Sequence, residues 1–153
     1  MRATVTMKDV KGFLGCRTIA LAGASRSGKK FGNAVLRALL ANGYGVIPVH
    51  PSAASLEGLP CVPTLAAIRD RIDGLVVVVP PAPTEILIRE AARRGIARVW
   101  MQPGSESADA VAFCAAHGIA EVHGECLLMF LGQSAGIHRL HHWVNGALGK
   151  LPR

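Results

Sequence analysis

Residues 18–32 read TIALAGASRSGKKFG, an apolar run followed by a turn that is rich in small and basic residues. Residues 18–23 carry no charge and little polarity, which is typical of a strand buried on both faces of a parallel sheet. Beyond the turn, within residues 32–41, apolar side chains recur with helical spacing at Val35, Leu36, Leu39 and Leu40. A strand, a turn and a helix in this order form the first unit of an α/β fold.

The same alternation continues along the chain. We expect strands at residues 18–23, 45–49, 74–79, 97–101 and 119–123. We expect helices at residues 5–14, 32–41, 84–94 and 107–117, and a further short helix at 64–71. A glycine that can end a helix stands before three of the strands, at Gly43, Gly95 and Gly118. The pattern predicts an α/β fold with a doubly wound, Rossmann-like parallel sheet of about five strands and helices on both faces, in three αβα layers.

Composition places the chain among globular proteins. Of its 153 residues, 50% are hydrophobic, which excludes a disordered chain. We expect a single domain over residues 1–153, with a core at 16–126 and a helical extension at 127–150. The apolar runs are far shorter than a membrane span and no apolar leader opens the chain, so we expect neither membrane insertion nor export. A reduced, cytoplasmic protein is favoured by four widely spaced cysteines, Cys16, Cys61, Cys114 and Cys126.

The charge of the chain calls for an anionic partner. Its formal net charge is +7, which suits nucleic acid, lipid headgroups or a phosphorylated metabolite. Between Lys11 and Leu56 there are six basic residues and no acid. We predict that this excess gathers around the turn at residues 23–30 and serves one small phosphorylated ligand. Only 5% of the residues are aromatic, which leaves little material for nucleic-acid binding by stacking.

The turn itself argues against a typical dinucleotide site. In a doubly wound fold, the first helix offers its free N–H groups to a phosphate beyond the first strand. The fingerprint G-x-G-x-x-G requires glycine where this chain has Ser25, and an acid about 20 residues on, where it has His50-Pro51-Ser52. A small NAD(P)-binding redox or sensor protein is therefore an alternative and not the first interpretation.

The turn also comes within one residue of a phosphate-binding P-loop, G-x-x-x-x-G-K-[ST]. Gly23, Gly28 and Lys29 fit this pattern, but Lys30 stands where the magnesium-binding hydroxyl should be. No expected strand ends in an aspartate that could supply a second metal contact. The turn therefore predicts phosphate binding without phosphoryl transfer.

Several motifs together resemble a known family. The resemblance rests on residues 23–25 (GAS), 28–30 (GKK), 48–51 (PVHP), 56–65 (LEGLPCVPTL), 77–81 (VVVPP), 99–104 (VWMQPG) and Cys126. The order and spacing of these motifs resemble those of the CoA-binding domain in succinyl-CoA synthetase α subunits and acyl-CoA synthetases. The pattern is similar, more closely still, to the small stand-alone CoA-binding proteins of bacteria.

The resemblance implies a site for coenzyme A or an acyl-CoA. It assigns to the phosphates the turn residues Gly23, Ala24, Ser25, Arg26, Lys29 and Lys30. It assigns to the adenosine side Val49, His50 and Pro51, and to the nucleotide and upper pantetheine Val79, Pro80 and Pro81. It places along the pantetheine path Met101 and Gln102. Related domains often carry a basic residue after the second strand, but residues 50–57 contain no Lys or Arg, so the partner of the 3′-phosphate is left open among His50, Lys29 and Lys30.

These observations favour a binding protein over an enzyme. We predict non-catalytic binding of CoA or a short acyl-CoA, with no catalytic residue and no metal ligand. Cys126 is interpreted as a small buried hydrophobe because nothing in the sequence marks it as a reactive thiol. A protein-interaction module with a vestigial pocket is a further alternative, and the apolar segment 127–148 is a candidate homodimer contact. We expect no nucleic-acid or membrane partner.

Overall fold

The computed structural model describes residues 4–131 of the chain. The strands are β1 (Thr18–Ala22), β2 (Gly45–Val49), β3 (Ser55–Leu56), β4 (Leu59–Pro60), β5 (Gly74–Val77), β6 (Arg98–Met101) and β7 (Ala120–Val122). The helices are α1 (Met7–Leu14), α2 (Phe31–Ala41), α3 (Pro81–Arg94) and α4 (Ala108–Ala116), with the 3-10 turns η1 (Leu65–Ala67) and η2 (Leu127–Met129). All five expected strands are present, and each agrees with its expected position to within two residues.

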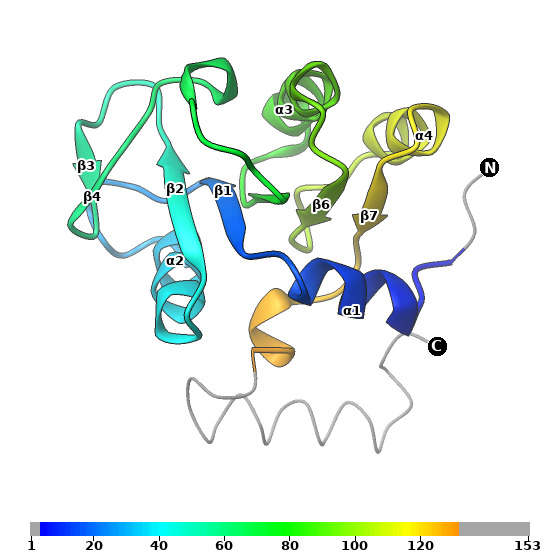
Figure 1. The fold of residues 1–153 in the computed structure, drawn as a ribbon, viewed down its shortest axis with the longest axis horizontal. Coiled ribbons are helices and arrows are strands. Elements are labelled where there is room, and N and C mark those ends of the chain that lie inside the picture. The colour runs from blue at the N-terminus through cyan, green and yellow to red at the C-terminus, as the bar shows by residue number, and fades with distance from the viewer. Residues whose placement is uncertain (1–3, 132–153) are drawn as a thin grey trace.

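Five of the strands form one parallel sheet in the order β2-β1-β5-β6-β7 (Figure 1). The chain passes from β1 to β2 on one side and then crosses back over β1 to reach β5. The register aligns Ala22 at the end of β1 with Val49 of β2 and with Val77 of β5. The carboxyl ends of these three strands therefore meet at one edge, and the direction of winding reverses between β1 and β5.

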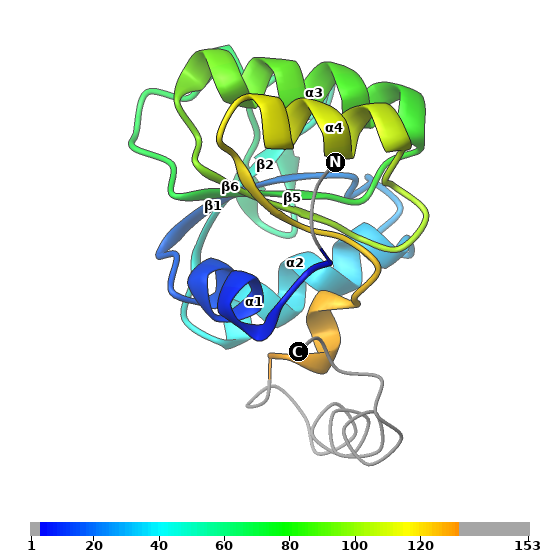
Figure 2. The ribbon, with the colours of Figure 1, turned by 90° about the vertical axis from the view of Figure 1, so that its right-hand side faces the viewer.

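Helices cover both faces of the sheet. Figure 2 shows α3 and α4 on one face, and α1 and α2 on the other with η2 beside them. Each face has its own hydrophobic core: one contains Phe13, Leu36 and Trp100, and the other contains Ile88 and Met101. This arrangement confirms the predicted three-layer, Rossmann-like fold.

Trp100 is the largest fully buried side chain. Its ring packs edge-on against Phe13 and Phe130, with centroids 5.5 and 5.7 Å away. Its Nε1–H donates to the carbonyl of Glu125 at 2.9 Å, as a buried indole N–H requires. Trp100 therefore joins α1, β6 and the segment after β7, and it is a core residue and not a platform for bases.

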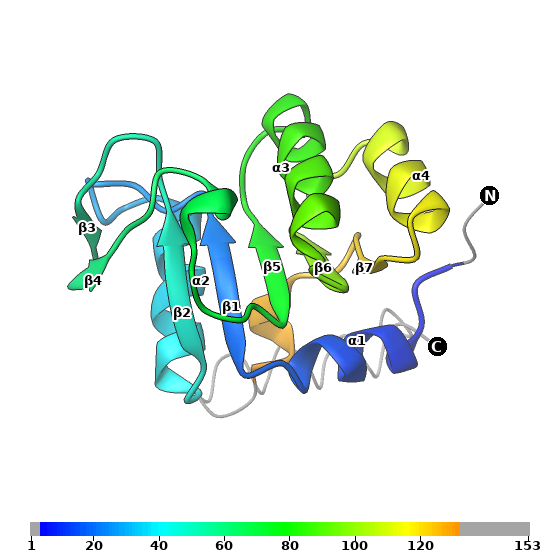
Figure 3. The same cartoon turned by 45° about the horizontal axis from the view of Figure 1, so that its top comes forward.

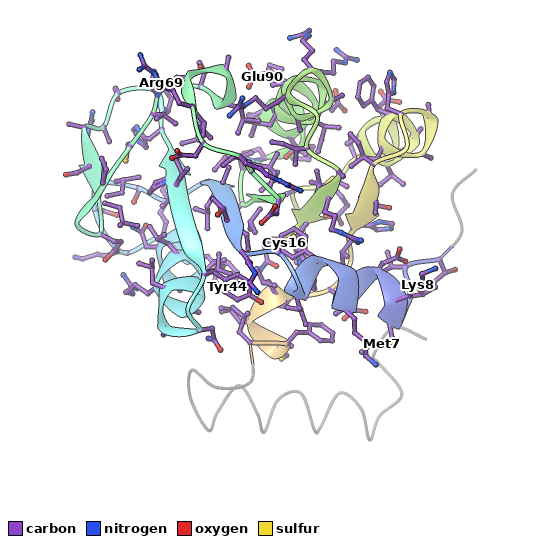
Figure 4. All side chains as sticks on the ribbon, in the orientation of Figure 1. Met7, Lys8, Cys16, Tyr44, Arg69 and Glu90 are labelled. Atoms are coloured by element: carbon purple, nitrogen blue, oxygen red, sulfur yellow. The ribbon has the colours of Figure 1, made fainter. Side chains whose placement is uncertain are left out.

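The segment before β1 is fastened at both ends of its helix. Thr6 and Asp9 form a capping box at the start of α1, in which Thr6 Oγ1 accepts from the Asp9 N–H and Asp9 accepts from the Thr6 N–H. Tyr44, labelled between α2 and α1 in Figure 4, donates its hydroxyl to the carbonyl of Leu14 at 2.7 Å. The predicted leading helix is thus present, shorter by two residues at its start.

Two segments differ from the sequence expectations. Residues 55–60, for which no strand was expected, form a short hairpin of β3 and β4 whose turn residues Glu57 and Gly58 have φ values of 51° and 78°. Two positive φ values suit a tight two-residue turn, and glycine accepts one at no steric cost. The helix expected at 64–71 is only the three-residue η1.

The segment after β7 is described only as far as residue 131. Within it, η2 is a single 3-10 turn at the start of the extension that was expected from residue 127 onwards. The remainder of the predicted extension, and with it the candidate homodimer contact, lies outside the described residues. In the part of the chain that is described, no helix combines the length and apolar character needed to cross a membrane.

Candidate functional site

The candidate site lies at the carboxyl edge of the sheet, between β1 and β5. In doubly wound folds, ligands bind in the crevice beyond the strand ends where the winding reverses. Figure 3 shows the arrowheads of β2, β1 and β5 side by side at this edge. The loops that follow them contain the predicted site residues at 23–30, 49–51 and 79–81.

Two glycines bring β1 and α2 into close contact. Gly23 has φ +126°, and a Cβ there would meet the carbonyl of Val78, which follows β5. A Cβ at Gly32, in the first turn of α2, would meet the carbonyl of Gly23. Both obstacles are backbone atoms that cannot move away easily, so larger residues at these positions would push the loop and the helix apart. Gly32 therefore shapes the site, although the sequence prediction did not include it.

Asn33, in the first turn of α2, fixes the conformation of the loop between β1 and α2. Its side chain is fully buried. Its Oδ1 accepts from the Ser25 N–H at 2.9 Å, and its Nδ2 donates to the Ser25 carbonyl at 2.9 Å. Nδ2 also donates to Glu57 Oε1 at 3.1 Å. One amide side chain thus fixes the backbone of Ser25 on both sides and connects the loop to the β3–β4 hairpin.

Glu57 and Arg37 complete this connection. Arg37 Nη1 lies 2.7 Å from Glu57 Oε1 and 3.2 Å from the carbonyl of Gly28, to which it donates. Arg37 therefore neutralises the one carboxylate that the hairpin brings to the loop. Sequence reasoning missed Asn33 and Glu57, and it counted Arg37 only among the basic residues expected around the turn. The one signal for Asn33 was a polar residue at a core position of an otherwise apolar helix face.

The amino end of α2 is open to an anion. Its N-cap is Lys30, and among the described residues no side chain caps the helix. The first N–H groups of a helix have no partner within the helix and lie at its positive end. Ser25 does not serve as the cap, because its hydroxyl contacts Ser27 Oγ at 2.7 Å and Asn33 Oδ1 at 3.3 Å.

Three cations surround this opening. Arg26, Lys29 and Lys30 are all exposed. Arg26 reaches sideways, and its Nη2 donates to Ser52 Oγ at 2.8 Å in the loop after β2. The loop geometry, the uncapped helix and the cations together fit a diphosphate, which needs N–H donors and positive charge.

The charge around the loop is smaller than the sequence suggested. Lys11 and Arg17 lie at the opposite edge of the sheet, where they border a separate cavity. Arg37 is paired with Glu57. Of the six basic residues that were expected to gather around the turn, only Arg26, Lys29 and Lys30 are available there. The expectation was wrong for Lys11 and Arg17 because both precede β1, whereas the turn follows it. The length of the strand therefore separates these two residues from the turn.

The loop after β2 is fixed by its own histidine. His50 Nδ1 accepts from the N–H groups of Ser52 and Ala53 at 3.1 and 2.9 Å. Only Nε2 is left for other contacts. Val49 is buried, whereas Pro51 is exposed beside His50.

The loop after β5 leads directly into α3. Val79 is half-buried and Pro80 is exposed. The helix begins at Pro81, three residues before the expected start, because proline suits the first position of a helix. Buried Thr84 donates to the carbonyls of Val79 and Pro80, at 3.3 and 3.0 Å. These bonds fix the backbone of Val79 and Pro80 beyond the carboxyl end of β5.

Met101 and Gln102 lie beneath the surface. Their exposed fractions are 0% and 1%. Gln102 Oε1 accepts from the Leu127 N–H at 2.7 Å, and its Nε2 lies 3.6 Å from Cys126 Sγ. The structure thus uses the Gln102 amide to attach η2 to the end of β6. All four cysteines, Cys126 among them, are free thiols.

The sequence and the fold match known proteins. The model of the CoA binding domain family matches residues 17–132. The acetate–CoA ligase (ADP-forming) II of Archaeoglobus fulgidus is 30% identical over 97 residues, which are 62% of this chain and 14% of that protein. The chain therefore spans only a small part of this curated relative.

Solved structures of small proteins match over most of their length. A conserved hypothetical protein from Pyrococcus furiosus is 37% identical with a TM-score of 0.69, over 72% of this chain and 96% of that one. A hypothetical protein from Pyrococcus horikoshii is 27% identical with a TM-score of 0.77, over 87% and 97% of the two chains. With most of its length matched by the family model, the chain belongs to the CoA binding domain family.

Proposed function

We propose that this protein binds coenzyme A or a short acyl-CoA without transforming it. The observation that carries the proposal is the uncapped amino end of α2, facing a loop that Asn33 holds open and three exposed cations surround. Membership of the CoA binding domain family supports CoA as the phosphorylated ligand.

The diphosphate of CoA is assigned to the loop between β1 and α2. The N–H groups at the start of α2 donate to it, and Lys29 and Lys30 supply charge-assisted contacts. Gly23 lets the turn lie against the backbone that follows β5, because a Cβ there would meet the carbonyl of Val78. Ala24 and Ser25 contribute backbone and hydroxyl groups at the same turn.

The 3′-phosphate is assigned to Arg26. No Lys or Arg follows β2 within residues 50–57, but the Arg26–Ser52 hydrogen bond brings a guanidinium to that loop. A guanidinium has five N–H donors in a fork that matches a phosphate, so one bond to Ser52 leaves most of them free. His50 is less suited to this role because its Nδ1 is engaged by its own loop.

The remaining contacts follow the loops around the crevice. Val49, His50 and Pro51 are assigned to the adenosine side, and the apolar wall of Val79, Pro80 and Pro81 to the nucleotide and upper pantetheine. A rigid proline wall offers an apolar face with no N–H to desolvate. Met101 and Gln102 are assigned to the pantetheine path by the resemblance alone, as part of its buried floor.

Binding rather than catalysis is favoured by how the candidate reactive groups are engaged. His50 Nδ1 accepts two backbone N–H groups, and Cys126 Sγ lies against the Gln102 amide. The ligase activity of the Archaeoglobus relative belongs to a protein of which this chain covers 14%. We therefore assign a carrier or sensor role.

The test is calorimetric titration of the full chain with CoA, acetyl-CoA, dephospho-CoA, NAD⁺ and ATP. We expect CoA and acetyl-CoA to bind with similar affinity, because the assigned contacts lie on the phosphates and the adenosine. NAD⁺ should bind far more weakly, since His50-Pro51-Ser52 stand directly after β2 where an acid would hold its ribose. Binding of NAD⁺ without binding of CoA would overturn the proposal. Incubation with acetyl-CoA, followed by mass spectrometry, should find the thioester intact.

A further inference from the structure

A cavity lies at the edge of the sheet opposite the proposed CoA site. Its volume is about 1080 Å³. It is bordered by the end of α1, the start of β1, the segment that leads into β5 and the end of α3, which come to the same side of the molecule in Figure 3. The five residues of β1 separate the two edges, a distance of roughly 16 Å at the usual rise of a strand. One ligand group therefore cannot occupy both sites.

The cavity is strongly positive. It is lined by six basic side chains, those of Lys11, Arg17, Arg69, Arg71, Arg94 and Arg98. Two carboxylates, Asp70 and Asp73, also line it. The carboxyl ends of α1 and α3 add about half a negative charge each. The two carboxylates and the two helix ends together balance about three of the six positive charges, and about three remain. The helix ends alone therefore do not explain why so many cations gather here.

Two of the arginines are held in place by the fold. Arg94 Nη2 donates to the carbonyl of Asp70 at 2.8 Å. Its Nε is buried and has no acceptor among the described residues. Arg98 lies across α1 at Gly12, where a Cβ would meet its guanidinium. These side chains are ordered before any ligand arrives.

Of the two carboxylates at the cavity, that of Asp73 is engaged within the protein, whereas Asp70 is exposed. Asp73 accepts from the N–H groups of Arg17 and Thr18, at 2.9 and 3.1 Å. Its other oxygen lies 3.5 Å from Arg71 Nε. The side chains of Arg17 and Arg69 are exposed at the rim of the cavity. They are free to turn toward an anion.

The side chains indicate what kind of anion fits. Five arginines present forked donors that match phosphate oxygens in pairs. No aromatic ring is among the residues that border the cavity, all of which belong to the described part of the chain, so there is no platform on which a base could stack. We propose that this cavity binds a small compound carrying several phosphate groups, through its phosphates, independently of the CoA site.

Sodium tripolyphosphate is the probe, titrated into the full ¹⁵N-labelled chain and followed by two-dimensional NMR. We expect saturable shifts at the amides of Gly12, Gly15, Asp73 and Gly95, which border the cavity. Saturating CoA should leave these shifts in place. Arg17→Gln with Arg69→Gln should weaken tripolyphosphate binding by roughly tenfold or more, because each exposed arginine supplies a charge-assisted contact.

A matched control removes two exposed charges elsewhere. Arg89→Gln with Arg93→Gln changes the net charge equally on α3, outside this cavity, and should leave the tripolyphosphate affinity within about twofold. The thermal midpoints of both variants and their CoA affinity should match those of the unaltered chain, which separates lost binding from lost folding.

Three results would overturn the proposal. The first is a set of shifts confined to residues 24–33, which would place the anion in the CoA site. The second is equal weakening by the control pair, which would show a general charge effect. The third is much tighter binding of a single-stranded oligonucleotide than of tripolyphosphate at equal salt, which would assign the surface to a nucleic-acid backbone.

Discussion

Asn33 determines the conformation of the candidate phosphate loop at the scale of a single residue. It is buried, and its amide satisfies both the N–H and the carbonyl of Ser25. Asparagine and the longer glutamine are the side chains whose amide offers an N–H donor and a carbonyl acceptor side by side. In the proposed site, the same contacts of Asn33 therefore serve both stability and binding.

We expect Asn33→Ala to lower both the free energy of unfolding and the affinity for CoA. The loss of stability should be about 1–3 kcal/mol, because backbone groups of Ser25 lose their buried partner. Urea denaturation and calorimetry measure the two effects. Asn42→Ala is the matched control, since Asn42 also donates to a backbone carbonyl, that of Ala38, at the far end of α2. It should cost stability but leave CoA affinity unchanged; an unaltered CoA affinity in Asn33→Ala would contradict the role given to the loop.

Arg26 is the residue that distinguishes CoA from dephospho-CoA in our proposal. Arg26→Ala should reduce the affinity for CoA by about tenfold, the usual size of a hydrogen bond to a charged group, and leave that for dephospho-CoA within about twofold. Calorimetry with the two ligands measures the ratio. Arg89→Ala, an exposed arginine of α3, should not alter it. If the Arg26 variant kept the full preference for CoA over dephospho-CoA, the 3′-phosphate would have to be bound by His50, Lys29 or Lys30 instead.

At the scale of elements, the proposed anion site is formed by the unit of β1, its loop and α2 as a whole. The contact of Gly32 with Gly23 aims the first turn of α2 at the space beyond β1. The hairpin of β3 and β4 then fixes the other side of the loop through Glu57. Helix and hairpin together leave Lys29 and Lys30 beside the open helix end.

Replacing both lysines tests this unit. Lys29→Ala with Lys30→Ala should weaken CoA binding by about 2–3 kcal/mol and reduce its dependence on salt, because exposed charges act through charge-assisted contacts that ions screen. Titrations at two salt concentrations measure both effects. Arg89→Ala with Arg93→Ala removes the same charge from α3 and should do neither. Wild-type affinity in the lysine variant would place these residues on the solvated surface.

At the scale of the whole molecule, Asp73 joins the starts of two neighbouring central strands. Its carboxylate accepts from the backbone of Arg17 and Thr18, just before and at the start of β1, and it directly precedes β5. These hydrogen bonds, with a smaller contribution from Arg71, hold the pKa of Asp73 below its ordinary value, against the opposing effect of partial burial. A carboxyl with a lower pKa in the folded chain than in the unfolded chain stabilises the fold above the unfolded pKa. That stabilisation is lost as the pH falls through the folded pKa.

Asp73→Asn should therefore destabilise the protein near neutral pH, by about 1–2 kcal/mol for charge-assisted bonds of this kind. The difference from the unaltered chain should shrink below about pH 4 and vanish in stronger acid, where Asp73 itself is protonated. Urea denaturation at a series of pH values follows the change. Asp70→Asn removes a carboxylate from the same segment without these bonds and should show little effect. A difference that persists unchanged at low pH would mean that shape, not charge, is what Asp73 contributes.

The alternation of apolar runs and helix-ending glycines was enough to predict the five parallel strands and the main helices. Burial on both faces forces a strand of this sheet to be continuously apolar, and that constraint is visible residue by residue. The loop at residues 23–30 was likewise predictable, because its position after the first strand and its glycines and lysines are local properties. The family followed from the same local motifs.

What only the tertiary structure decided are the contacts between segments far apart in the chain. The pairing of Asn33 and Arg37 with Glu57 depends on a hairpin 20 residues or more away, and the reach of Arg26 to Ser52 depends on β1 and β2 being neighbours. The division of the basic residues between two edges of the sheet depends on the direction of β1. A sequence records charge in order along the chain, whereas a ligand meets it in space, and the five residues of a strand are enough to move Arg17 from the phosphate loop to the opposite side of the molecule.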